Sequence, residues 1–302
     1  MAQDSHPQRI AMLGATRGCG LEALLILLQH TNTTVHVLVR DPSAFRAALS
    51  ERLPSAAEYE SKGRLVVAKG DAMVTSDVVS FLTAAQEDLT HVVTSLGAKP
   101  VISGLTALFK PVQLSQPDIC QRTMAVLLDA LRQLKEVPHL VVVSSNGIAK
   151  QSHSKLPLAL KPLYGYYLRV AHDDKHEMET KIHSAYGLQS PAFNPSPRKA
   201  AAASETAKLD PSKLTIVRPS LLTDGAARGK IRASTNGMDL RSAYTASRAD
   251  VGLFLVDQVI RPAKTTSDAP HIDVQFEAGG RPSDAVSIKD GSKWEQGIVL
   301  AY

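Results

Sequence analysis

Short apolar runs recur along the chain at intervals that leave room for a helix between successive runs. Most of their positions are apolar in succession, whereas a strand exposed on one face would alternate apolar and polar residues. Continuous runs of this kind are typical of strands buried on both faces of a parallel sheet. The predicted strands are Ile10–Leu13, Val35–Val39, Leu65–Ala68, His91–Thr94, Leu140–Val143 and Leu214–Val217.

Helical periodicity fills the intervals between these runs. Leu21–Leu28 forms one apolar helix, and a second begins after Pro117 and is predicted to stop at Val137-Pro138, because proline disrupts a helix. Another begins near Ser247, which forms a capping pair with Asp250. Such alternation of strands and helices predicts a Rossmann-type α/β fold with a doubly wound parallel sheet. The second helix carries its apolar residues at Cys120, Met124, Leu127, Leu128, Leu131 and Leu134.

Two segments depart from this regular plan. Residues 189–212 interrupt a helix-to-strand connection with prolines and an alanine run, which is consistent with a flexible surface insertion or with a lid or partner-binding segment. The region 219–302 is expected to form a small C-terminal substrate lobe. We therefore expect a single domain over residues 1–302 with one insertion and one lobe, since open α/β sheets often grow to this length.

Composition and charge narrow the function classes. The net charge of +5 is spread without basic runs, which argues against a nucleic-acid partner and is compatible with an anionic small ligand. No apolar run approaches the ~20 residues of a membrane helix. Only Cys19 and Cys120 are present, so a disulfide framework is excluded and a reducing, cytoplasmic location is expected.

A glycine-rich turn follows the first predicted strand and leads directly into a helix. Glycines let backbone N–H groups and the helix N-terminus approach a pyrophosphate that side chains would block. The alternative is a tight turn with a purely structural role, but the strand-turn-helix context favours dinucleotide binding. The candidate cofactor residues of this turn are Gly14, Thr16, Arg17, Gly18, Cys19 and Gly20.

Arg40 occupies the end of the second strand. NAD-preferring sites place a carboxylate there to accept hydrogen bonds from the ribose 2′-hydroxyl. A guanidinium cannot accept them, but it can bind a 2′-phosphate, and Arg17 is positioned in the sequence to close on the same group. NADP(H) is therefore the expected cofactor, the alternative being an Arg40–Asp41 pair in solvent and an exposed loop position for Arg17.

The ends of the third and fourth strands supply further candidates, because ligands of such sheets bind at the carboxyl ends of strands. Asp71 is placed to meet the adenine amino group and Ala72 to line the ring, although Asp71 alternatively caps the next helix. Ser95, Leu96 and Gly97 are expected to pass the adenosine ribose and phosphate.

Several motifs together resemble the atypical short-chain dehydrogenase/reductases. Besides the glycine turn, they include Asp174–Glu179 and, most specifically, Thr215–Asp224 with its Arg218-Pro219 step. Within this family the chain is similar to the NmrA-like NAD(P)-binding group that includes biliverdin-IXβ/flavin reductase. The resemblance spans roughly residues 9–256, apart from the 189–212 insertion.

The resemblance implies roles at matching positions. Pro219, Ser220 and Leu221 would pass the nicotinamide, Ser145 would end the fifth strand at the substrate side, and Lys175 would approach the nicotinamide ribose. Ser144, next to Ser145, is a candidate cofactor-binding residue. Ser145 and Lys175 are the candidate catalytic residues. The structural alternatives are an ion pair of Lys175 with Glu179 and serines that satisfy backbone groups at a strand end. The family often has glycine where Arg17 stands.

The conventional family pair of a tyrosine with a lysine four residues later is missing. Tyr164, Tyr166 and Tyr167 are followed at that distance by Leu168, Val170 and Ala171. Packing is therefore the favoured interpretation of the tyrosine cluster, while hydride transfer remains feasible because the cofactor supplies its chemistry. The expected activity is NADPH-dependent reduction of a small aromatic, flavin-like or quinone-like acceptor. The alternative is a non-catalytic NADP(H) sensor with a protein partner, contacted through the 189–212 insertion.

Two rival chemistries receive little support. His172 and His176 lie one helical turn apart, as zinc ligands do, but Asp173 replaces the glutamate of that motif and no third ligand is marked, so no metal is expected. Ser144-Ser145 lacks the flanking glycines of a hydrolase elbow.

Overall fold

The computed structural model describes residues 8–30, 32–101, 112–188, 192–193, 209–234, 240, 242–260, 271–278 and 297–302. Parallel strands and helices alternate through the first half of the chain, as the apolar pattern predicts. This half contains β1 (Gln8–Leu13), α1 (Gly18–Gln29), β2 (Thr33–Val39), α2 (Pro42–Arg52), α3 (Ala56–Ser61), β3 (Leu65–Lys69), α4 (Thr75–Ala84), β4 (Leu89–Thr94), β5 (Pro100–Val101), β6 (Gln113–Leu114), α5 (Ile119–Leu131) and β7 (His139–Val143).

The second half adds helical turns beside the sheet and then further strands. Its elements are α6 (Lys150–Lys155), the 3₁₀ turn η2 (Leu158–Leu160), the π-helical η3 (Leu163–Tyr167), α7 (Arg169–Tyr186), the 3₁₀ turn η5 (Pro211–Lys213), β8 (Leu214–Pro219), β9 (Leu221–Thr223), β10 (Lys230–Ser234), β11 (Thr245–Ser247), α9 (Arg248–Phe254), the π-helical η6 (Leu255–Ile260), β12 (Asp273–Ala278) and β13 (Ile298–Ala301).

The main sheet has nine strands in the order β12-β10-β13-β8-β7-β4-β1-β2-β3. The strands from β8 to β3 are all paired in parallel, which confirms the predicted Rossmann-type α/β class. From β1 the chain first adds β2 and β3 on one side, then returns to add β4, β7 and β8 on the other. This reversal between β1 and β4 opens a crevice at the carboxyl ends of the strands, where such sheets bind ligands.

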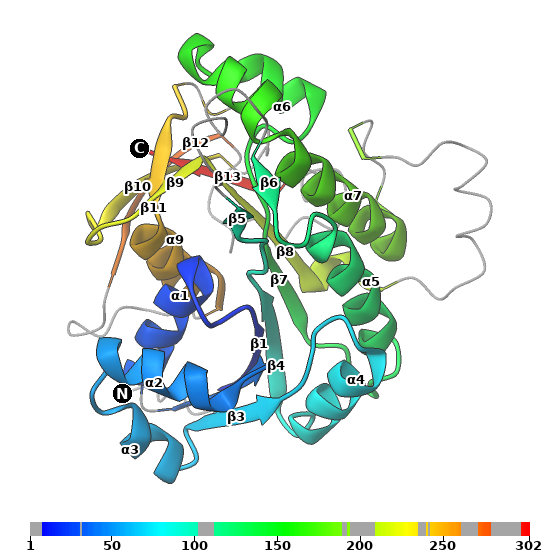
Figure 1. Cartoon of the computed structure of the whole chain (residues 1–302), viewed down its shortest axis with the longest axis vertical. Coiled ribbons are helices and arrows are strands. Elements are labelled where there is room, and N and C mark those ends of the chain that lie inside the picture. Colours follow the sequence, from blue (N-terminus) through cyan, green and yellow to red (C-terminus); the bar gives the residue numbers. More distant parts are fainter. Residues whose placement is uncertain are drawn as a thin grey trace.

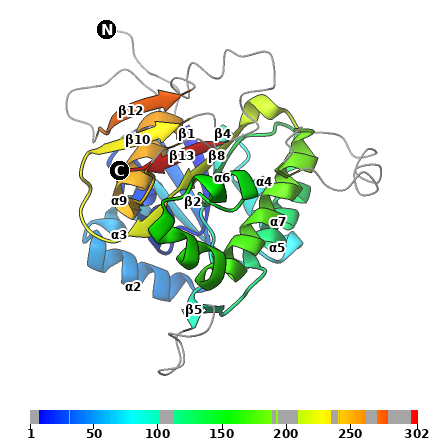
Figure 2. The ribbon, with the colours of Figure 1, turned by 90° about the horizontal axis from the view of Figure 1, so that it is seen from above.

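Helices cover both faces of the sheet (Figures 1 and 2), with α1, α2 and α9 on one face and α4, α5 and α7 on the other. Each layer buries its own apolar cluster against the strands. The predicted end of the helix after Pro117 is wrong, because α5 ends at Leu131. Beyond the helix end, the backbone N–H groups of Arg132, Gln133 and Leu134 still donate to carbonyl oxygens three or four residues earlier. Leu134 is buried although it lies outside the helix.

The C-terminal strands extend the main sheet. β13 pairs in parallel with β8 and antiparallel with β10, while β12 pairs with β10 at the edge. β9 and β11 form a separate two-stranded sheet. The division into one domain with a substrate lobe over 219–302 remains a prediction, and residues 189–191 and 194–208 of the insertion lie outside the described residues.

α9 packs directly on α1 because a glycine stands at their closest approach. A Cβ on Gly252 would lie 2.6 Å from the Cβ of Glu22 and 2.8 Å from the backbone nitrogen of Ala23. Any larger residue would push the two helices apart. Within the described ranges, no helix is both long and apolar enough to cross a bilayer.

Candidate functional site

The turn between β1 and α1 requires glycine at two positions for steric reasons. Gly14 has φ +89°, and a Cβ there would lie 2.7 Å from the carbonyl carbon of Ser95. A Cβ on Gly20 would lie 2.3 Å from the carbonyl oxygen of Gly14. The turn can therefore fold tightly against the end of β4 only without side chains at these positions.

α1 presents an uncapped N-terminus at this turn. The helix begins at Gly18, its N-cap Arg17 makes no side-chain capping bond, and its first turn contains no acidic residue. The orphan N–H groups and the positive end of the helix dipole together favour an anion. The glycine cradle therefore fits the pyrophosphate of a dinucleotide.

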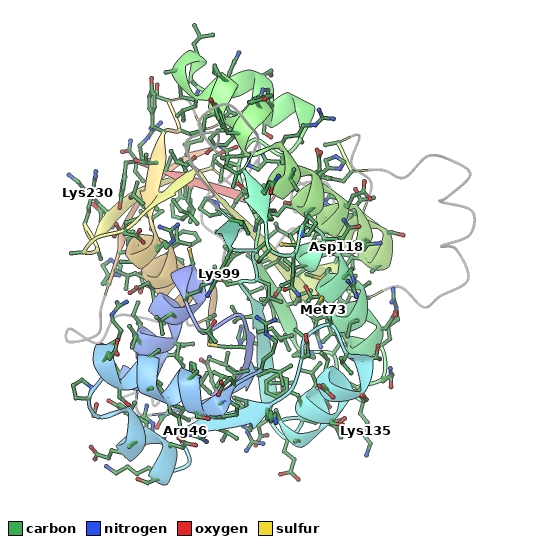
Figure 3. The ribbon with its side chains drawn as sticks, in the orientation of Figure 1. Arg46, Met73, Lys99, Asp118, Lys135 and Lys230 are labelled. Atoms are coloured by element: carbon green, nitrogen blue, oxygen red, sulfur yellow. The ribbon has the colours of Figure 1, made fainter. Side chains whose placement is uncertain are left out.

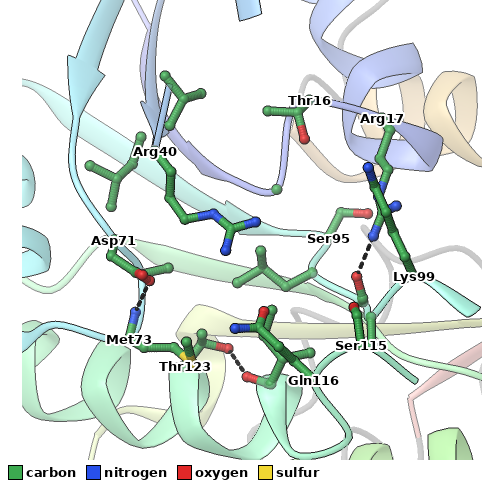
Figure 4. Close-up of a pocket in the computed structure, with 18 of the residues that line it drawn as sticks. Thr16, Arg17, Arg40, Asp71, Met73, Ser95, Lys99, Ser115, Gln116 and Thr123 are labelled. Atoms are coloured by element: carbon green, nitrogen blue, oxygen red, sulfur yellow. Dashed lines mark hydrogen bonds between the residues drawn. The ribbon is translucent and has the colours of Figure 1, made fainter. Parts of the chain in front are cut away.

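A cavity of about 470 Å³ opens beside this turn (Figure 4), at the carboxyl ends of β1 to β4 and the start of α5. Nine of the predicted cofactor residues line it: Gly14, Thr16, Arg17, Arg40, Asp71, Ala72, Ser95, Leu96 and Gly97. The sequence interpretation did not single out its other lining residues: Leu38, Val39, Gly70, Met73, Ala98, Lys99, Ser115, Gln116, Ile119 and Thr123.

Three basic side chains, Arg17, Arg40 and Lys99, line this cavity. Arg40 reaches across it from the end of β2, while Arg17 and Lys99 stand on the opposite side (Figure 4). Arg17 donates from Nη2 to the carbonyl oxygen of Gly97 at 2.8 Å. Burial and then the charge of Arg40 lower the pKa of Arg17. An anion between the two guanidinium groups would relieve this repulsion.

The alternative of an Arg40–Asp41 pair receives no support from the hydrogen bonds. The Asp41 carboxylate accepts from the backbone N–H of Ala44 at 3.0 Å and so caps α2. Arg40 itself is exposed at the cavity.

Lys99 was missed by the sequence interpretation. Its side chain is exposed, and it projects near the centre of the view in Figure 3, whereas Arg46, Lys135 and Lys230 project near the edge of that view. It precedes the short hairpin of β5 and β6. Its carbonyl oxygen accepts from the N–H of Ser115 at 3.0 Å, which places both residues on the cavity wall. No periodic signal marks a two-residue strand, so this position could be found only from the fold.

Asp71 closes a local turn at the end of β3. Its carboxylate accepts from the N–H of Met73, and its own N–H donates to the Asp77 carboxylate, both at 2.9 Å. The alternative role as a helix N-cap is wrong, because α4 begins at Thr75 with Val74 as its N-cap. Asp71 and Ala72 both remain on the cavity wall.

A second group of predicted residues gathers at the ends of β7 and β8. Lys175 of α7 donates from Nζ to the carbonyl oxygens of Val143 at 2.9 Å and Ser144 at 3.2 Å. The alternative ion pair of Lys175 with Glu179 is wrong, because Glu179 is fully buried and pairs with Arg218 at 2.5 Å. Burial alone would raise the pKa of Glu179, but the charge and hydrogen bonds of Arg218 lower it.

The hydroxyl and amide groups near these strand ends bond mainly to protein. Ser144 is buried and is close enough to Glu179 to help lower the pKa of that carboxyl, but its hydroxyl makes no hydrogen bond of normal geometry to the described residues. Ser145 donates to the carbonyl oxygen of Asn146 at 3.2 Å. The Asn146 amide donates to the hydroxyl of Ser220 at 3.2 Å, which ties β7 to β8. This part of the site is thus cross-linked internally.

Several predicted residues do not line the described cavity. Gly18, Cys19 and Gly20 belong to the first turn of α1 and form the bottom of the cradle. Ser144, Ser145, Pro219 and Ser220 lie at the ends of β7 and β8, whereas Lys175 lies on α7 and Leu221 begins β9. Their assignment to the nicotinamide end of the cofactor stays a prediction.

Tyr164 of the tyrosine cluster is buried and is not activated as a proton donor. Burial raises the pKa of Tyr164 to about 12, and its ring packs edge-on against His172 at 5.0 Å. The rings of Tyr166 and Tyr167 pack edge-on against each other, with their centroids 5.2 Å apart. The packing interpretation therefore holds for Tyr164.

The histidines of α7 do not form a metal site in the described part of the chain. Burial lowers the pKa of His172 to about 4, and His176 faces the carbonyl oxygen of Ala192 at 3.1 Å. No cluster of three potential metal-binding side chains occurs in the described ranges.

Comparison with known proteins places this geometry in a family context. The model of a family described as NAD(P)H-binding matches residues 14–262. Reductase pytE of Aspergillus terreus is 28% identical over 282 residues, covering 88% of this chain and 96% of the relative. Oxidase pynE of Aspergillus niger is 27% identical over 286 residues, covering 83% and 92%.

Solved structures share the fold. A short-chain dehydrogenase/reductase of the wide type from Veillonella parvula, crystallised in complex with NADP, superposes with a TM-score of 0.56 at 14% identity. The match covers 98% of this chain and 94% of that one. At this identity the likeness supports the Rossmann-type fold alone.

Proposed function

The chain belongs to the NAD(P)H-binding family, and from this premise we propose that it is an NADPH-dependent oxidoreductase that passes hydride to an aromatic, flavin-like or quinone-like acceptor. One observation carries the choice of NADPH: a guanidinium stands where a carboxylate would bind the 2′-hydroxyl of NAD(H). Arg40 reaches into the same cavity as Arg17 and Lys99. Three cations around one cavity favour a phosphorylated adenosine over an unphosphorylated one.

The coenzyme would supply the hydride, and the protein would hold both partners in position. Gly14 and Gly20 admit the pyrophosphate, while Asp71, Ala72 and Leu96 line the adenosine end. At the other end, Lys175 donates to the carbonyl oxygens of Val143 and Ser144, and its third N–H would bind the nicotinamide ribose. The acceptor would bind near Ser145, the tyrosine-bearing segment and the region after Pro219.

Reduction without an activated tyrosine suits an acceptor that needs little acid catalysis. The relatives named as a reductase and an oxidase support redox chemistry in general terms. Within the family we propose a place in the NmrA-like group. The motifs 174–179 and 215–224 support that place, because they supply Lys175, Glu179 and Arg218 to the interactions described above.

A non-catalytic NADP(H) sensor is the second candidate. It is favoured by the buried Tyr164, whose raised pKa makes it a poor proton donor to a neutral substrate, and by the absence of a lysine four residues beyond it. Such a sensor would present the 189–212 insertion to a protein partner.

Binding and turnover separate the candidates. Calorimetry with NADPH, NADP⁺ and NADH tests the cofactor, and the nicotinamide absorbance band with a panel of flavins, quinones and tetrapyrroles tests the reaction. We expect tighter binding of NADPH than NADH, and NADPH oxidation with at least one acceptor. Tight NADPH binding without oxidation by any acceptor would favour the sensor, and no heat with either phosphorylated coenzyme would refute both candidates.

A further inference from the structure

A further cation stands directly over the glycine turn. Arg248 is the first residue of α9, and its Cδ and Nε lie 3.9 Å and 4.0 Å from the position that a Cβ on Gly18 would occupy. Its Nη1 pairs with Oδ1 of Asp224 at 2.8 Å. The Asp224 side chain is 92% exposed, whereas that of Arg248 is 32% exposed. The arginine therefore lies against the protein while its partner lies in solvent.

This position is electrostatically unfavourable for a cation in the absence of an anion. α1 begins at Gly18, so its partial positive charge faces Arg248. Burial raises the pKa of the neighbouring Cys19 thiol to about 12, and Arg248 is the largest of the charges that oppose this rise. The Asp224 pair, exposed as it is, offsets little of this repulsion.

The backbone of Arg248 is firmly held, so repulsion cannot move it away. The Ser247 hydroxyl caps α9 by accepting from the Asp250 N–H at 2.9 Å. The fully buried Asp250 carboxylate accepts in turn from the N–H groups of Arg228 and Gly229 and from the hydroxyl of Tyr302. Gly252 then seats α9 on α1 without clearance. Only the arginine side chain is free to change its partner.

We propose that Arg248 binds the pyrophosphate of the coenzyme, and that Asp224 is an internal anion which the pyrophosphate displaces. The proposal rests on the proposed function, since it concerns the same dinucleotide at the α1 N-terminus. A diphosphate over Gly18 would lie between the helix start and the guanidinium, which turns two repelling positive groups into two ligands of one anion. Asp224 thereby sets how tightly the coenzyme is held.

The first test uses a probe that lacks the pyrophosphate. Arg248→Gln should weaken NADPH and NADH to the same extent, about tenfold, which is the loss expected for one charge-assisted hydrogen bond. Its affinity for adenosine 2′-monophosphate, measured by a ligand-observed NMR titration, should be unchanged. Arg52→Gln is the matched control, because it also removes an arginine from an ion pair, here with Glu22 of α1, and should leave all three affinities unchanged.

The second test concerns the internal anion. Asp224→Asn should bind NADPH a few-fold more tightly than the wild type, because no carboxylate competes for Arg248. In the Arg248→Gln background the same change should have no effect. A cycle of the two single variants and the double variant measures this coupling directly.

The outcomes distinguish this proposal from the proposed function. If the wild type binds neither coenzyme, the proposed function falls and this inference with it. If the wild type binds NADPH and Arg248→Gln binds it equally well with an unchanged melting temperature, only the role of Arg248 falls. The role would also be overturned if Arg248→Gln weakened the affinity for adenosine 2′-monophosphate as much as that for NADPH. The same holds if Asp224→Asn still changed NADPH affinity in the Arg248→Gln background.

Discussion

The two ends of the crevice are built on opposite plans. At the β1–β4 edge, defined by Gly14–Arg17, Arg40, Asp71 and Ser95–Lys99, long basic side chains project into a cavity. At the β7–β8 edge, defined by Ser144–Asn146, Lys175, Glu179 and Arg218–Leu221, polar groups bond to one another and are largely buried. The basic side chains of the first edge are available to bind an anionic ligand, whereas the charged groups of the second edge are paired within the protein.

This difference suggests that the β1–β4 edge binds the ligand, while the paired groups of the β7–β8 edge stabilise the fold. A cation that faces a cavity is stabilised when an anionic ligand binds beside it. A buried ion pair costs folding stability when either partner is removed, because the other charge is left buried and unpaired. Substitutions at the β1–β4 edge should therefore act on binding, and those in the buried Glu179–Arg218 pair at the β7–β8 edge on folding. The predictions below challenge this separation, beginning with the largest expected effect.

Arg218→Met should destabilise the protein by about 3 to 5 kcal/mol, because it leaves Glu179 buried and unpaired. Arg218 also stacks over the ring of Phe193 at 5.2 Å and packs against Gly297. Urea unfolding followed by circular dichroism measures the loss. Replacing both partners, Glu179→Leu with Arg218→Met, should recover much of it, and Arg46→Gln in the exposed pair with Glu60 should leave the unfolding midpoint nearly unchanged. A mild effect of Arg218→Met would show that this edge is less dependent on its charges than we infer.

Gly20→Ala should weaken NADPH binding by about 100-fold, since the new Cβ would collide with the Gly14 carbonyl and open the cradle. Calorimetry measures the affinity, and the melting temperature reports how much of the loss comes from unfolding. Gly165→Ala is the control, because its Cβ would make only ordinary contacts with His153. Retained affinity in Gly20→Ala would remove the steric argument for the turn.

Arg40→Asp should reverse the coenzyme preference. We expect NADPH affinity to fall by about 10- to 100-fold, because a charge-assisted bond to the phosphate is lost, and NADH affinity to rise. Lys99→Ala should reduce NADPH affinity less than Arg40→Asp does, because a lysine ammonium is a flexible, well-hydrated charge that cannot bind a phosphate through two parallel N–H groups as a guanidinium can. Stability should change little in either variant. Unchanged NADPH affinity in Arg40→Asp would refute the role assigned to that side chain.

The smallest expected effect concerns acid. Burial lowers the pKa of His172 on α7 from 6.5 to about 4, so the unfolded chain takes up this proton at a higher pH than the folded protein. The contribution of His172 to stability is fully present above pH 6.5 and is lost as the pH falls towards 4. Between pH 7 and pH 5.5, the free energy of unfolding of His172→Phe should therefore fall by about 1 kcal/mol less than that of the wild type. Urea unfolding at the two pH values measures the difference.

Hydrogen exchange can locate this acid effect. Burial also lowers the pKa of His183, at the other end of α7, to about 4. The opening free energies of α7 amides, obtained from exchange rates corrected for the intrinsic pH dependence of exchange, should therefore fall at a higher pH than those of α1 amides. Equal acid losses in wild type and His172→Phe would show that His172 accepts its proton without opening the fold.

The central strands and the glycine turn were predictable because their signals are local. Apolar runs such as Val35–Val39 are typical of strands buried on both faces of a parallel sheet, and Gly14 and Gly20 lie just before and within the first turn of a helix. The Ser247–Asp250 cap was also recognisable, since its two partners are three residues apart. For these features the neighbouring residues contain nearly all the physical information.

The remaining features depend on contacts between distant residues. Lys99 faces the cavity only because β5 and β6 pair, and Arg248 reaches Gly18 only because Gly252 admits α1 closely. The structural alternative for Lys175 was an ion pair with Glu179 at helical spacing, but Arg218 from β8 pairs with that carboxylate instead. A helical wheel ranks neighbours by distance along the helix, and it cannot anticipate a stronger partner from a strand.

The place of β13 has a consequence for how the polypeptide matures. Residues 298–301 pair in parallel with β8 and antiparallel with β10, although both of those strands are made much earlier by the ribosome. Until this segment emerges, β8 has an open edge with unsatisfied backbone groups, which is the kind of surface that invites mispairing. Closure by so distant a segment raises the contact order and slows folding. Late-arriving residues thus complete the sheet beside Arg218, and a nascent chain stalled short of them would be a natural client for chaperones.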